Sequence, residues 1–396
     1  MNQESKRDDV KEYEAMLATR KAQEVVIPTG PYDVYMDEQN IPIHRGLGVY
    51  DMRQLPLAPW KRLGGQGTFI ELEGQAGYFG MYVVEVPAGG VLNSERHMYE
   101  EIFLVIEGHG STEVWREGSS KKQTFEWQPG THFGVPLNVW HRLVNATTSP
   151  ALVLVATSAP VMMQLLPSRS FIFDNPFEFL DLYDESDDYF KPRDELEPQV
   201  GTQVKKLRTN LIPDIANCDV PLANLRAPGH GHLHLREMAG TTFFFNHIQV
   251  YPSGRYSTAH SHEAGRVLVC LKGKGYSHTW PLGLGKRPWE TGKGHLVQRQ
   301  DYIPGGMVTA APAAGDWFHQ HFATAKEGLR VTAIRHPLKS VETPGEEREF
   351  PDGTMYLGPG RHEVTYPEED PQVRKDYKEA LEKEGAEFTM PESVYR

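Results

Sequence analysis

The chain carries one sequence pattern twice, and this duplication constrains the fold more than any other feature. In the first copy, GGVLNSERHMYEEIFLVIEG (89–108) is followed by GTHFGVPLNVWHRLVN (130–145). In the second copy, GRYSTAHSHEAGRVLVCLKG (254–273) is followed by GMVTAAPAAGDWFHQHFA (306–323). Each copy has one or two histidines before an apolar run that ends in glycine, and a further histidine after an aromatic residue. Two copies of one supersecondary unit predict a duplicated domain.

The distances between equivalent histidines support the duplication. His97 and His262 are 165 positions apart, and His141 and His319 are 178 positions apart. The two offsets differ by 13 residues, which is the size of a loop insertion, and we place it within the glycine-rich stretch 282–296.

Short runs rich in β-branched and aromatic residues fill both halves of the chain. Examples are YFGMYVVEV (78–86) and ALVLVAT (151–157), and glycine or proline separates such runs. Many short strands with this spacing are typical of an all-β sandwich or barrel. We therefore predict an all-β protein with one barrel in each half.

A helix is predicted near each end of the chain. The stretch 8–24 has an apolar stripe among charged residues. Near the C-terminus, Asp370 can cap a helix, Pro371 suits its first position and Gly385 can end it. The expected C-terminal helix is 371–384, with an apolar stripe made of Val373, Tyr377 and Leu381.

The length of 396 residues fits two domains. Between them, FIFDNPFEFLDLYDESDDYFKPRDELEP is aromatic at first and then strongly acidic, so we interpret it as a connection whose aromatic part packs on a barrel. The predicted boundaries are 1–170 for the N-terminal domain with its barrel core at 68–162, 171–200 for the linker, and 201–396 for the C-terminal domain with its barrel core at 241–337.

Charge and composition exclude several classes of partner. The chain has 41 Lys+Arg against 53 Asp+Glu, and this net charge of −12 argues against nucleic acid and an anionic membrane surface. The N-terminus is charged, without an apolar signal region, and no apolar stretch reaches the length of a membrane span. Of the two cysteines, Cys270 lies in the apolar run VLVCL, which predicts a buried thiol. We expect a cytoplasmic protein.

The second half offers three imidazoles for one metal ion. Alternate residues of a strand share a face, so His260 and His262 can reach the same ion. His319, from a distant strand, would complete a three-histidine site with open coordination positions, which is typical of a catalytic metal.

Two further residues of the second half are candidates for a catalytic role. Arg266 lies four residues after His262, where it can pair with an anionic substrate or form a surface salt bridge. His321 lies two residues after His319, so it can act as an acid or base, orient a ligand or replace His319 at the metal.

The first half offers a second, alternative metal site. Glu95, His97, Glu101 and His141 would form a two-histidine, two-carboxylate set, and oxygen-rich coordination suits Mn(II), Fe(II) or Mg(II). The other reading is a barrel that has lost its metal and serves as a scaffold. A separate stretch places three more histidines at spacing two, and we interpret it as a solvated or interface strand; these are His230, His232 and His234.

These motifs resemble those of the cupin superfamily, and their duplication resembles a bicupin. The first half matches the two cupin motifs at Gly89, His97, Glu101, Gly108, Gly130, Pro136, His141 and Asn145. The second half matches them at Gly254, His260, His262, Gly273, Gly306, Pro312 and His319. Four positions differ from the cupin motifs. In the first half Glu95 replaces the first histidine and Asn138 replaces a glycine; in the second half Arg266 replaces the glutamate and Ala323 replaces the asparagine. The resemblance implies two jelly-roll barrels, each with a metal site inside its mouth.

The strings GKGYSHTW and WFHQHF are similar to the bicupin group that contains gentisate and 1-hydroxy-2-naphthoate dioxygenases. This resemblance implies Fe(II) on His260, His262 and His319, and a dioxygenase that cleaves a small, oxygenated, anionic aromatic or enolic substrate with O2. Mn, Ni, Co and Zn are alternative metals for this three-histidine site. The alternatives are a lyase or isomerase acting through an enediolate, and a non-enzymatic binding or storage bicupin. We also expect a homodimer or a larger homo-oligomer.

Overall fold

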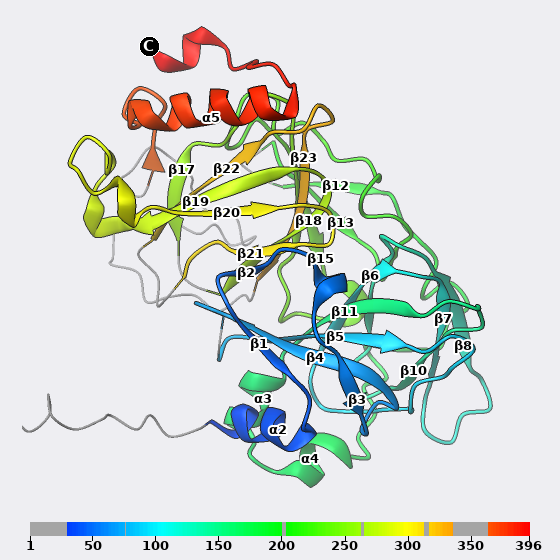
Figure 1. Ribbon diagram of the computed structural model, residues 1–396. Coiled ribbons are helices and arrows are strands. Elements are labelled where there is room, and N and C mark those ends of the chain that lie inside the picture. Colours follow the sequence, from blue (N-terminus) through cyan, green and yellow to red (C-terminus); the bar gives the residue numbers. More distant parts are fainter. Residues whose placement is uncertain (1–29, 76, 200–202, 263–264, 313–316, 336–362) are drawn as a thin grey trace, which may run out of the picture.

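The computed structural model describes residues 30–75, 77–199, 203–262, 265–312, 317–335 and 363–396. Figure 1 shows two bodies of β-sheet, with helices at the two far ends of the molecule. The predicted N-terminal helix at 8–24 lies outside the described residues. No helix among the described residues is long and apolar enough to cross a membrane.

The first barrel consists of a large sheet and a small sheet that face each other. The large sheet runs in the order β1-β4-β5-β11-β6-β9-β14, with β3 beside β4, and the small sheet runs β10-β7-β8. Their strands are β1 (Ile43–Gly46), β3 (Ala58–Trp60), β4 (Gly65–Leu72), β5 (Gly80–Val86), β6 (Glu101–Glu107), β7 (Gly110–Trp115), β8 (Gln123–Trp127), β9 (His132–Val135), β10 (Trp140–Val144), β11 (Ala151–Thr157) and β14 (Leu211–Ile212). Side chains such as Phe69, Val84 and Phe133 fill the space between them.

The second barrel has the same plan. Its large sheet runs β12-β13-β15-β16-β23-β18-β21-β2, and its small sheet runs β20-β19-β22-β17-β24. The strands are β2 (Gly48–Val49), β12 (Leu196–Pro198), β13 (Lys205–Arg208), β15 (Gly231–Arg236), β16 (His247–Tyr251), β17 (Ala259–His262), β18 (Arg266–Gly273), β19 (Gly275–Pro281), β20 (Gln298–Tyr302), β21 (Met307–Thr309), β22 (Trp317–Ala323), β23 (Leu329–Arg335) and β24 (Glu363–Val364). The predicted all-β fold with two jelly-roll barrels is confirmed.

The two large sheets pack on each other through a shared apolar core. Ile70, Ile102 and Leu154 of the first barrel belong to the same cluster as Ile248 and Val267 of the second. Each large sheet is therefore buried on both faces, and this explains why strands such as β11, with the sequence ALVLVAT, are apolar throughout instead of alternating.

Each barrel also donates a short strand to the other. Gly48–Val49 (β2), from the N-terminal part of the chain, pairs with β21 of the second barrel. Leu211–Ile212 (β14), which follows the linker, pairs with β9 of the first barrel.

Three short helices cover one end of the first barrel: α2 (Pro31–Gln39), α3 (Ala159–Leu165) and α4 (Arg169–Phe173). Figure 1 shows them together beside β1 and β4. Single 3-10 turns occur at η1 (Met52–Gln54), η2 (Met238–Gly240), η3 (Leu282–Leu284), η4 (Gly294–Leu296) and η5 (Glu392–Tyr395). The turns η3 and η4 lie in the loop where the sequence places the insertion.

The C-terminal helix α5 (Pro371–Glu384) begins and ends at the predicted residues. The Asp370 side chain accepts a hydrogen bond from the backbone N–H of Gln372, and Gly385 ends the helix at φ +63°. Val373, Tyr377 and Leu381 pack on the outer face of the small sheet of the second barrel. Figure 1 shows this helix over β17 and β22.

The aromatic linker packs on the first barrel, as predicted. In its aromatic part Ile172 is buried in the core of this barrel, with Phe173 and Phe179 packed against it. Tyr183 and Phe190, from its acidic part, are buried against Val114 and Val139. The guanidinium of Arg116 lies 2.9 Å from the carboxylate of Glu178, another residue of this segment.

Candidate metal centre

Four potential metal ligands meet inside the first barrel: Glu95, His97, Glu101 and His141. Glu95 and His141 exchange two backbone hydrogen bonds of 3.0 Å. Glu101 is the first residue of β6, and His141 lies in β10 of the opposite sheet. The ligand atoms of the four side chains all lie within 4.8 Å of one another. Among the described residues this is the only such group of three or more, and it is the alternative set expected for the first half.

The carboxylates and imidazoles of this four-residue cluster face each other at short range. The Nε2 atom of His97 lies 3.3 Å from Oε2 of Glu101. The Nε2 atom of His141 lies 3.7 Å from Oε1 of Glu95 and 3.8 Å from Oε2 of Glu101. His97, Glu101 and His141 are each at most 3 % exposed.

Backbone carbonyls fix the tautomers of both histidines. The Nδ1 atom of His97 lies 2.9 Å from the carbonyl oxygen of Tyr99, and Nδ1 of His141 lies 3.1 Å from that of Val139. Because a carbonyl oxygen only accepts, Nδ1 carries the hydrogen, and Nε2 of the neutral ring presents a lone pair to the cluster. Both Nε2 atoms and Oε2 of Glu101 are buried without a hydrogen-bond partner. Lone pairs that meet carboxylates in this way require a cation, either a proton or a metal ion.

Donors outside the cluster hold the remaining carboxylate oxygens. The Tyr82 hydroxyl donates a hydrogen bond of 3.0 Å to Oε1 of Glu101. The Arg62 guanidinium donates one of 3.0 Å to Oε2 of Glu95. Each carboxylate therefore keeps one oxygen directed at the centre, which is how outer hydrogen bonds orient the ligands of protein metal sites.

The pKa shifts of Glu101 and His141 also favour a positive charge at the centre of the cluster. Burial alone would raise the pKa of Glu101, but the charge of His97 and the close contact with the His141 imidazole lower it to about 2. Burial alone would lower the pKa of His141, but its contacts with Glu101 and Glu95 raise it above the usual histidine value. These shifts favour an ionised Glu101 and a proton on His141, and a metal ion would compete with this proton.

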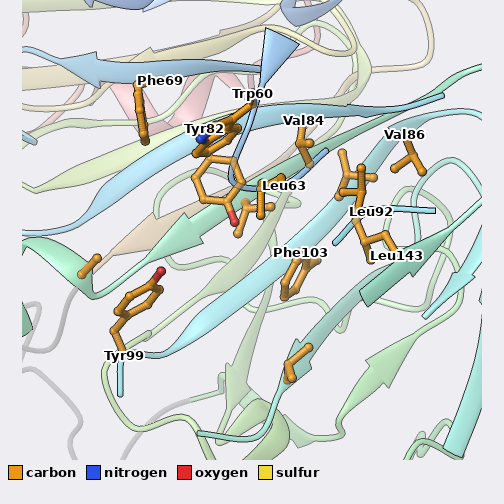
Figure 2. Close-up of a cluster of buried hydrophobic side chains, with 14 of the residues drawn as sticks. Trp60, Leu63, Phe69, Tyr82, Val84, Val86, Leu92, Tyr99, Phe103 and Leu143 are labelled. Carbon is orange, nitrogen blue, oxygen red and sulfur yellow. The ribbon is translucent and has the colours of Figure 1, made fainter. Parts of the chain in front are cut away.

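An aromatic layer closes the barrel over the cluster. The Tyr99 ring stacks on His97 with centroids 3.6 Å apart, and Phe173 of α4 meets Tyr99 edge-on. A groove of about 190 Å³ lies on the outer side of this layer and is lined by Tyr35, Ile172 and Phe173, among others. Figure 2 shows Tyr82 and Tyr99 within the apolar core of this barrel.

The second barrel brings two of its three predicted ligands together. His260 and His319 are cross-strand partners on β17 and β22, and their Nε2 atoms are 3.0 Å apart. Two ligands at about 2.1 Å from one ion, at a right angle, would also be about 3 Å apart, so a shared proton and a shared ion both fit this distance. The side chain of His262 lies outside the described residues, and the three-histidine set stays a prediction.

The two predicted catalytic residues lie in the interior of the same barrel. The rings of His319 and His321 share one face of β22, with centroids 5.4 Å apart. Burial, and then the charge of Arg226, lowers the pKa of His321 to about 3. Arg266 begins β18 and is directly opposite Arg335 on β23. Their roles in catalysis stay predictions.

Of the two readings of the third histidine stretch, the solvated strand is wrong, and the strand lies at the interface between the two barrels. His230 and His232 are buried, with 0 % and 5 % of their surface exposed. The alternate residues Leu233 and Leu235 belong to the core shared by the barrels, so the strand is covered on both faces.

Sequence reasoning missed Arg62 and Tyr82, the two donors that orient the carboxylates. Arg62 precedes Glu95 by 33 residues, and Tyr82 precedes Glu101 by 19. No motif joins these positions, because strand pairing in the folded chain creates the contacts. The only available signal was a tyrosine hydroxyl in the apolar strand GMYVVEV, which needs a partner once buried.

Solved structures with a similar fold include seed globulins and a bacterial enzyme. A tryptophan-to-phenylalanine variant of oxalate decarboxylase from Bacillus subtilis has a TM-score of 0.42 at 10% identity, over 73% of this chain and 76% of that one. The 7S globulin of Momordica charantia has a TM-score of 0.43 at 12% identity, over 73% and 83%. Vicilin from Corylus avellana (hazelnut) has a TM-score of 0.43 at 9% identity, over 73% and 85%. Similarity at this level says nothing about activity.

A comparison with curated protein sequences gave no match. The family model described as "Cupin domain" matches residues 82–157. This segment runs from β5 to the end of β11 and contains all four residues of the metal-ligand cluster. The first barrel is therefore a cupin domain.

Proposed function

We propose that this protein is a metal-dependent enzyme whose divalent ion is bound in the first barrel by Glu95, His97, Glu101 and His141. The observation that carries the proposal is the set of buried atoms without partners: Nε2 of both histidines and Oε2 of Glu101. A polar atom that is buried without a partner costs stability, and a bound cation would satisfy all three atoms at once.

The donor set favours Mn(II) or Fe(II). Two carboxylates balance the charge of a divalent ion, and a mixture of imidazole and carboxylate ligands suits these metals better than Cu(I). The carboxylates are already oriented, because Arg62 and Tyr82 hold their outer oxygens.

The reaction we propose is oxidation of a small, oxygenated, anionic aromatic or enolic substrate by O2. Glu95, His97, Glu101 and His141 would hold the ion, and a bound Fe(II) or Mn(II) would supply the electron transfer that lets O2 react. Tyr99, Phe103 and the other apolar side chains of this barrel would exclude water from the site.

Metal content and oxygen uptake test the proposal. Protein purified without oxygen should contain close to one Mn or Fe per chain, and an oxygen electrode should record uptake with members of a panel of hydroxylated aromatic acids and diketones. His141→Ala should lose both the metal and the uptake, because too few ligands remain to hold a labile ion. The matched control is His132→Gln, which changes another buried histidine of the same barrel outside the cluster.

Three outcomes would overturn the proposal. Substrate turnover without oxygen uptake would replace the dioxygenase with a lyase or isomerase at the same metal. Activity that survives His141→Ala but is lost in His262→Ala would place the catalytic metal in the second barrel, on the three-histidine set. If the protein binds neither Mn nor Fe, the non-enzymatic binding or storage role would be the remaining function.

A further inference from the structure

The chain from residue 365 to residue 396 lies outside the sheets of the second barrel, and we call it the C-terminal segment. It contains α5 and η5 but no strand. Hydrogen bonds to backbone carbonyls attach it to the barrel: the Tyr377 hydroxyl donates one of 2.6 Å to Ala323, and the Thr389 hydroxyl donates one of 2.7 Å to Ser253. Because no sheet has to break, this segment can open while the barrel stays folded.

A buried carboxyl group lies where the C-terminal segment meets the barrel. Glu369, just before α5, is 6 % exposed, and its Oε1 accepts a hydrogen bond of 2.6 Å from the hydroxyl of Tyr256 in the barrel. Tyr256 thereby uses its only hydrogen, so the Tyr395 hydroxyl, 2.9 Å away, is the donor to Tyr256. One chain of hydrogen bonds therefore joins the end of the protein, the barrel and the start of α5.

The surroundings of Glu369 suit a neutral carboxyl group. Its Oε2 is buried without a hydrogen-bond partner. Within the described part of the chain no lysine or arginine forms an ion pair with Glu369, and the guanidinium of Arg374 lies over the Tyr395 ring, 3.4 Å from its centroid. An ionised carboxylate with one bare oxygen is costly in such a place.

The same surroundings shift the ionisation of Glu369. Burial raises its pKa to about 7, although the hydrogen bond with Tyr256, the charge of Arg374 and the contact with Gln320 lower it. The titratable and charged groups that face this carboxyl are Tyr256 of the barrel and Tyr366, Asp370, Arg374 and Tyr395 of the C-terminal segment.

We propose that the C-terminal segment is a pH-sensitive cover of the second barrel, which stays closed while the Glu369 carboxyl is neutral and opens more often once this carboxyl ionises. Opening brings the carboxylate into water, where its charge is solvated. The inference is independent of the proposed function, since it uses no residue of the first barrel.

The cover lies over the outer face of β22. Gln320, the residue in contact with Glu369, lies between His319 and His321 on this strand, and alternation places its side chain on the opposite face from theirs. The Gln320 amide donates a hydrogen bond of 2.8 Å to the carbonyl oxygen of Ser257, and the Ser257 hydroxyl accepts one of 2.9 Å from the backbone N–H of His321. Opening therefore uncovers the strand whose inner face carries these two histidines.

The direction of the pH dependence follows from the two states of Glu369. In the open form its pKa is the ordinary 4.5, and in the closed form it is about 7. Between these values the open form loses the proton while the closed form keeps it, so the equilibrium constant for opening rises with pH and then levels off. From pH 5 to pH 8 these two pKa values give a rise of about 70-fold.

Hydrogen exchange of the full-length protein, followed by mass spectrometry at pH 5 and pH 8, tests the inference. Rates are divided by those of unstructured peptides at the same pH. Protection of peptides from α5 should fall by about 70-fold, and at both pH values it should be lower than that of peptides from β5, because the segment opens alone. Glu369→Gln cannot ionise and should show the same protection at both pH values.

Two further variants complete the test. Glu368→Gln is the matched control: this neighbouring carboxylate pairs with Lys286 at 2.6 Å, and its loss should leave the 70-fold change in place. Tyr256→Phe removes the donor that stabilises the ionised form, so the change should move to higher pH; it serves if Glu369→Gln does not fold. The inference is overturned if α5 protection is equal at both pH values, if Glu369→Gln keeps the change, if Tyr256→Phe leaves its pH unchanged, or if α5 and β5 are equally protected.

Discussion

Each carboxylate of the metal-ligand cluster has one oxygen held from outside and one directed at the centre. For Glu101 the outer donor is the Tyr82 hydroxyl, and for Glu95 it is the Arg62 guanidinium. The two donors differ in kind: a neutral hydroxyl leaves the charge of Glu101 unbalanced, whereas the guanidinium of Arg62 already compensates Glu95. Glu101 therefore contributes more to the attraction of a divalent ion than Glu95 does.

Removal of the Tyr82 hydroxyl should weaken metal binding without unfolding the barrel. Tyr82→Phe keeps the ring in the apolar core but frees the outer oxygen of Glu101. We expect metal affinity to fall about tenfold, as for other outer hydrogen bonds of metal sites, and stability to fall by about 1 kcal/mol. Competition with a chelator measures the affinity. Tyr32→Phe is the control, because the buried Tyr32 hydroxyl has no hydrogen-bond partner; an equal loss in both variants would contradict the prediction.

The residues of the metal-ligand cluster could be predicted from the sequence, but their close approach could not. Glu95, His97, Glu101 and His141 lie in two short motifs, so their spacing alone makes them candidate ligands. That their ligand atoms converge depends on tautomers and burial, which spacing does not reveal. The departure at Asn138 has a local reason: this residue adopts φ +57°, a left-handed conformation that glycine and asparagine tolerate best.

At the scale of elements, the C-terminal helix was predictable because its signals are local. The cap, the proline at the first position and the final glycine are all within the helix or next to it. The packing of this helix was not predictable in the same way. Tyr377 donates a hydrogen bond of 2.6 Å to the carbonyl oxygen of Ala323, and Tyr256 donates one of 2.6 Å to the carboxylate of Glu369. Both contacts join segments far apart in the sequence.

The buried carboxylate of Glu369 should make the stability of the protein depend on pH. Burial raises its pKa from 4.5 to about 7. Between these values the unfolded chain loses the proton while the folded chain keeps it, so stability is highest below pH 4.5 and falls as the pH rises to about 7. The loss is at most about 3 kcal/mol. Urea unfolding across this pH range measures it.

Two variants identify Glu369 as the source of this dependence. Glu369→Gln cannot ionise, so its stability should lack the decline over this range. Glu368→Gln is the control: the hydrogen bond with Lys286 lowers the pKa of Glu368 instead of raising it, so this variant should keep the decline. An unchanged decline in Glu369→Gln would assign the effect to other groups.

At the scale of the whole molecule, the duplication was visible in the sequence and the union of the two halves was not. The repeated motifs predict two barrels, but β2 and β14 are only two residues long and carry no motif, and each pairs with the other barrel. In the sequence, the apolar residues of the shared core look like those of any buried strand. Their periodicity does not show which sheet packs against them.

The shared core should make the two barrels unfold together. Ile248, fully buried in this core, lies on β16 of the second barrel. Ile248→Ala should lower stability by about 2–5 kcal/mol and shift one transition that tryptophan fluorescence and far-UV circular dichroism report alike. Val331→Ala, inside the second barrel only, should shift the same single transition. Two transitions, of which only one moves in Ile248→Ala, would show that the barrels unfold independently.

The apolar surface around α3 and α4 supports the prediction of a homo-oligomer. Leu165, Phe177 and Leu180 are 68 %, 58 % and 56 % exposed, and a neighbouring groove is lined by Val34 and Phe173. Phe177 and Leu180 belong to the aromatic part of the linker. Exposed apolar side chains of this size are unfavourable in water, and we propose that a second copy of the chain covers them across a two-fold axis.

Substitution within this patch should therefore separate the subunits. Light scattering at micromolar concentration should give the mass of two chains for the unchanged protein. The double variant Leu165→Ser, Phe177→Ser should give the mass of one chain, because it places polar groups where the partner needs apolar contact. The matched control is Leu296→Ser, since Leu296 is 46 % exposed in η4 of the second barrel, away from the patch, and its loss should leave the dimer intact. A single-chain mass for the unchanged protein would contradict the prediction, and dissociation by Leu296→Ser would move the contact to the second barrel.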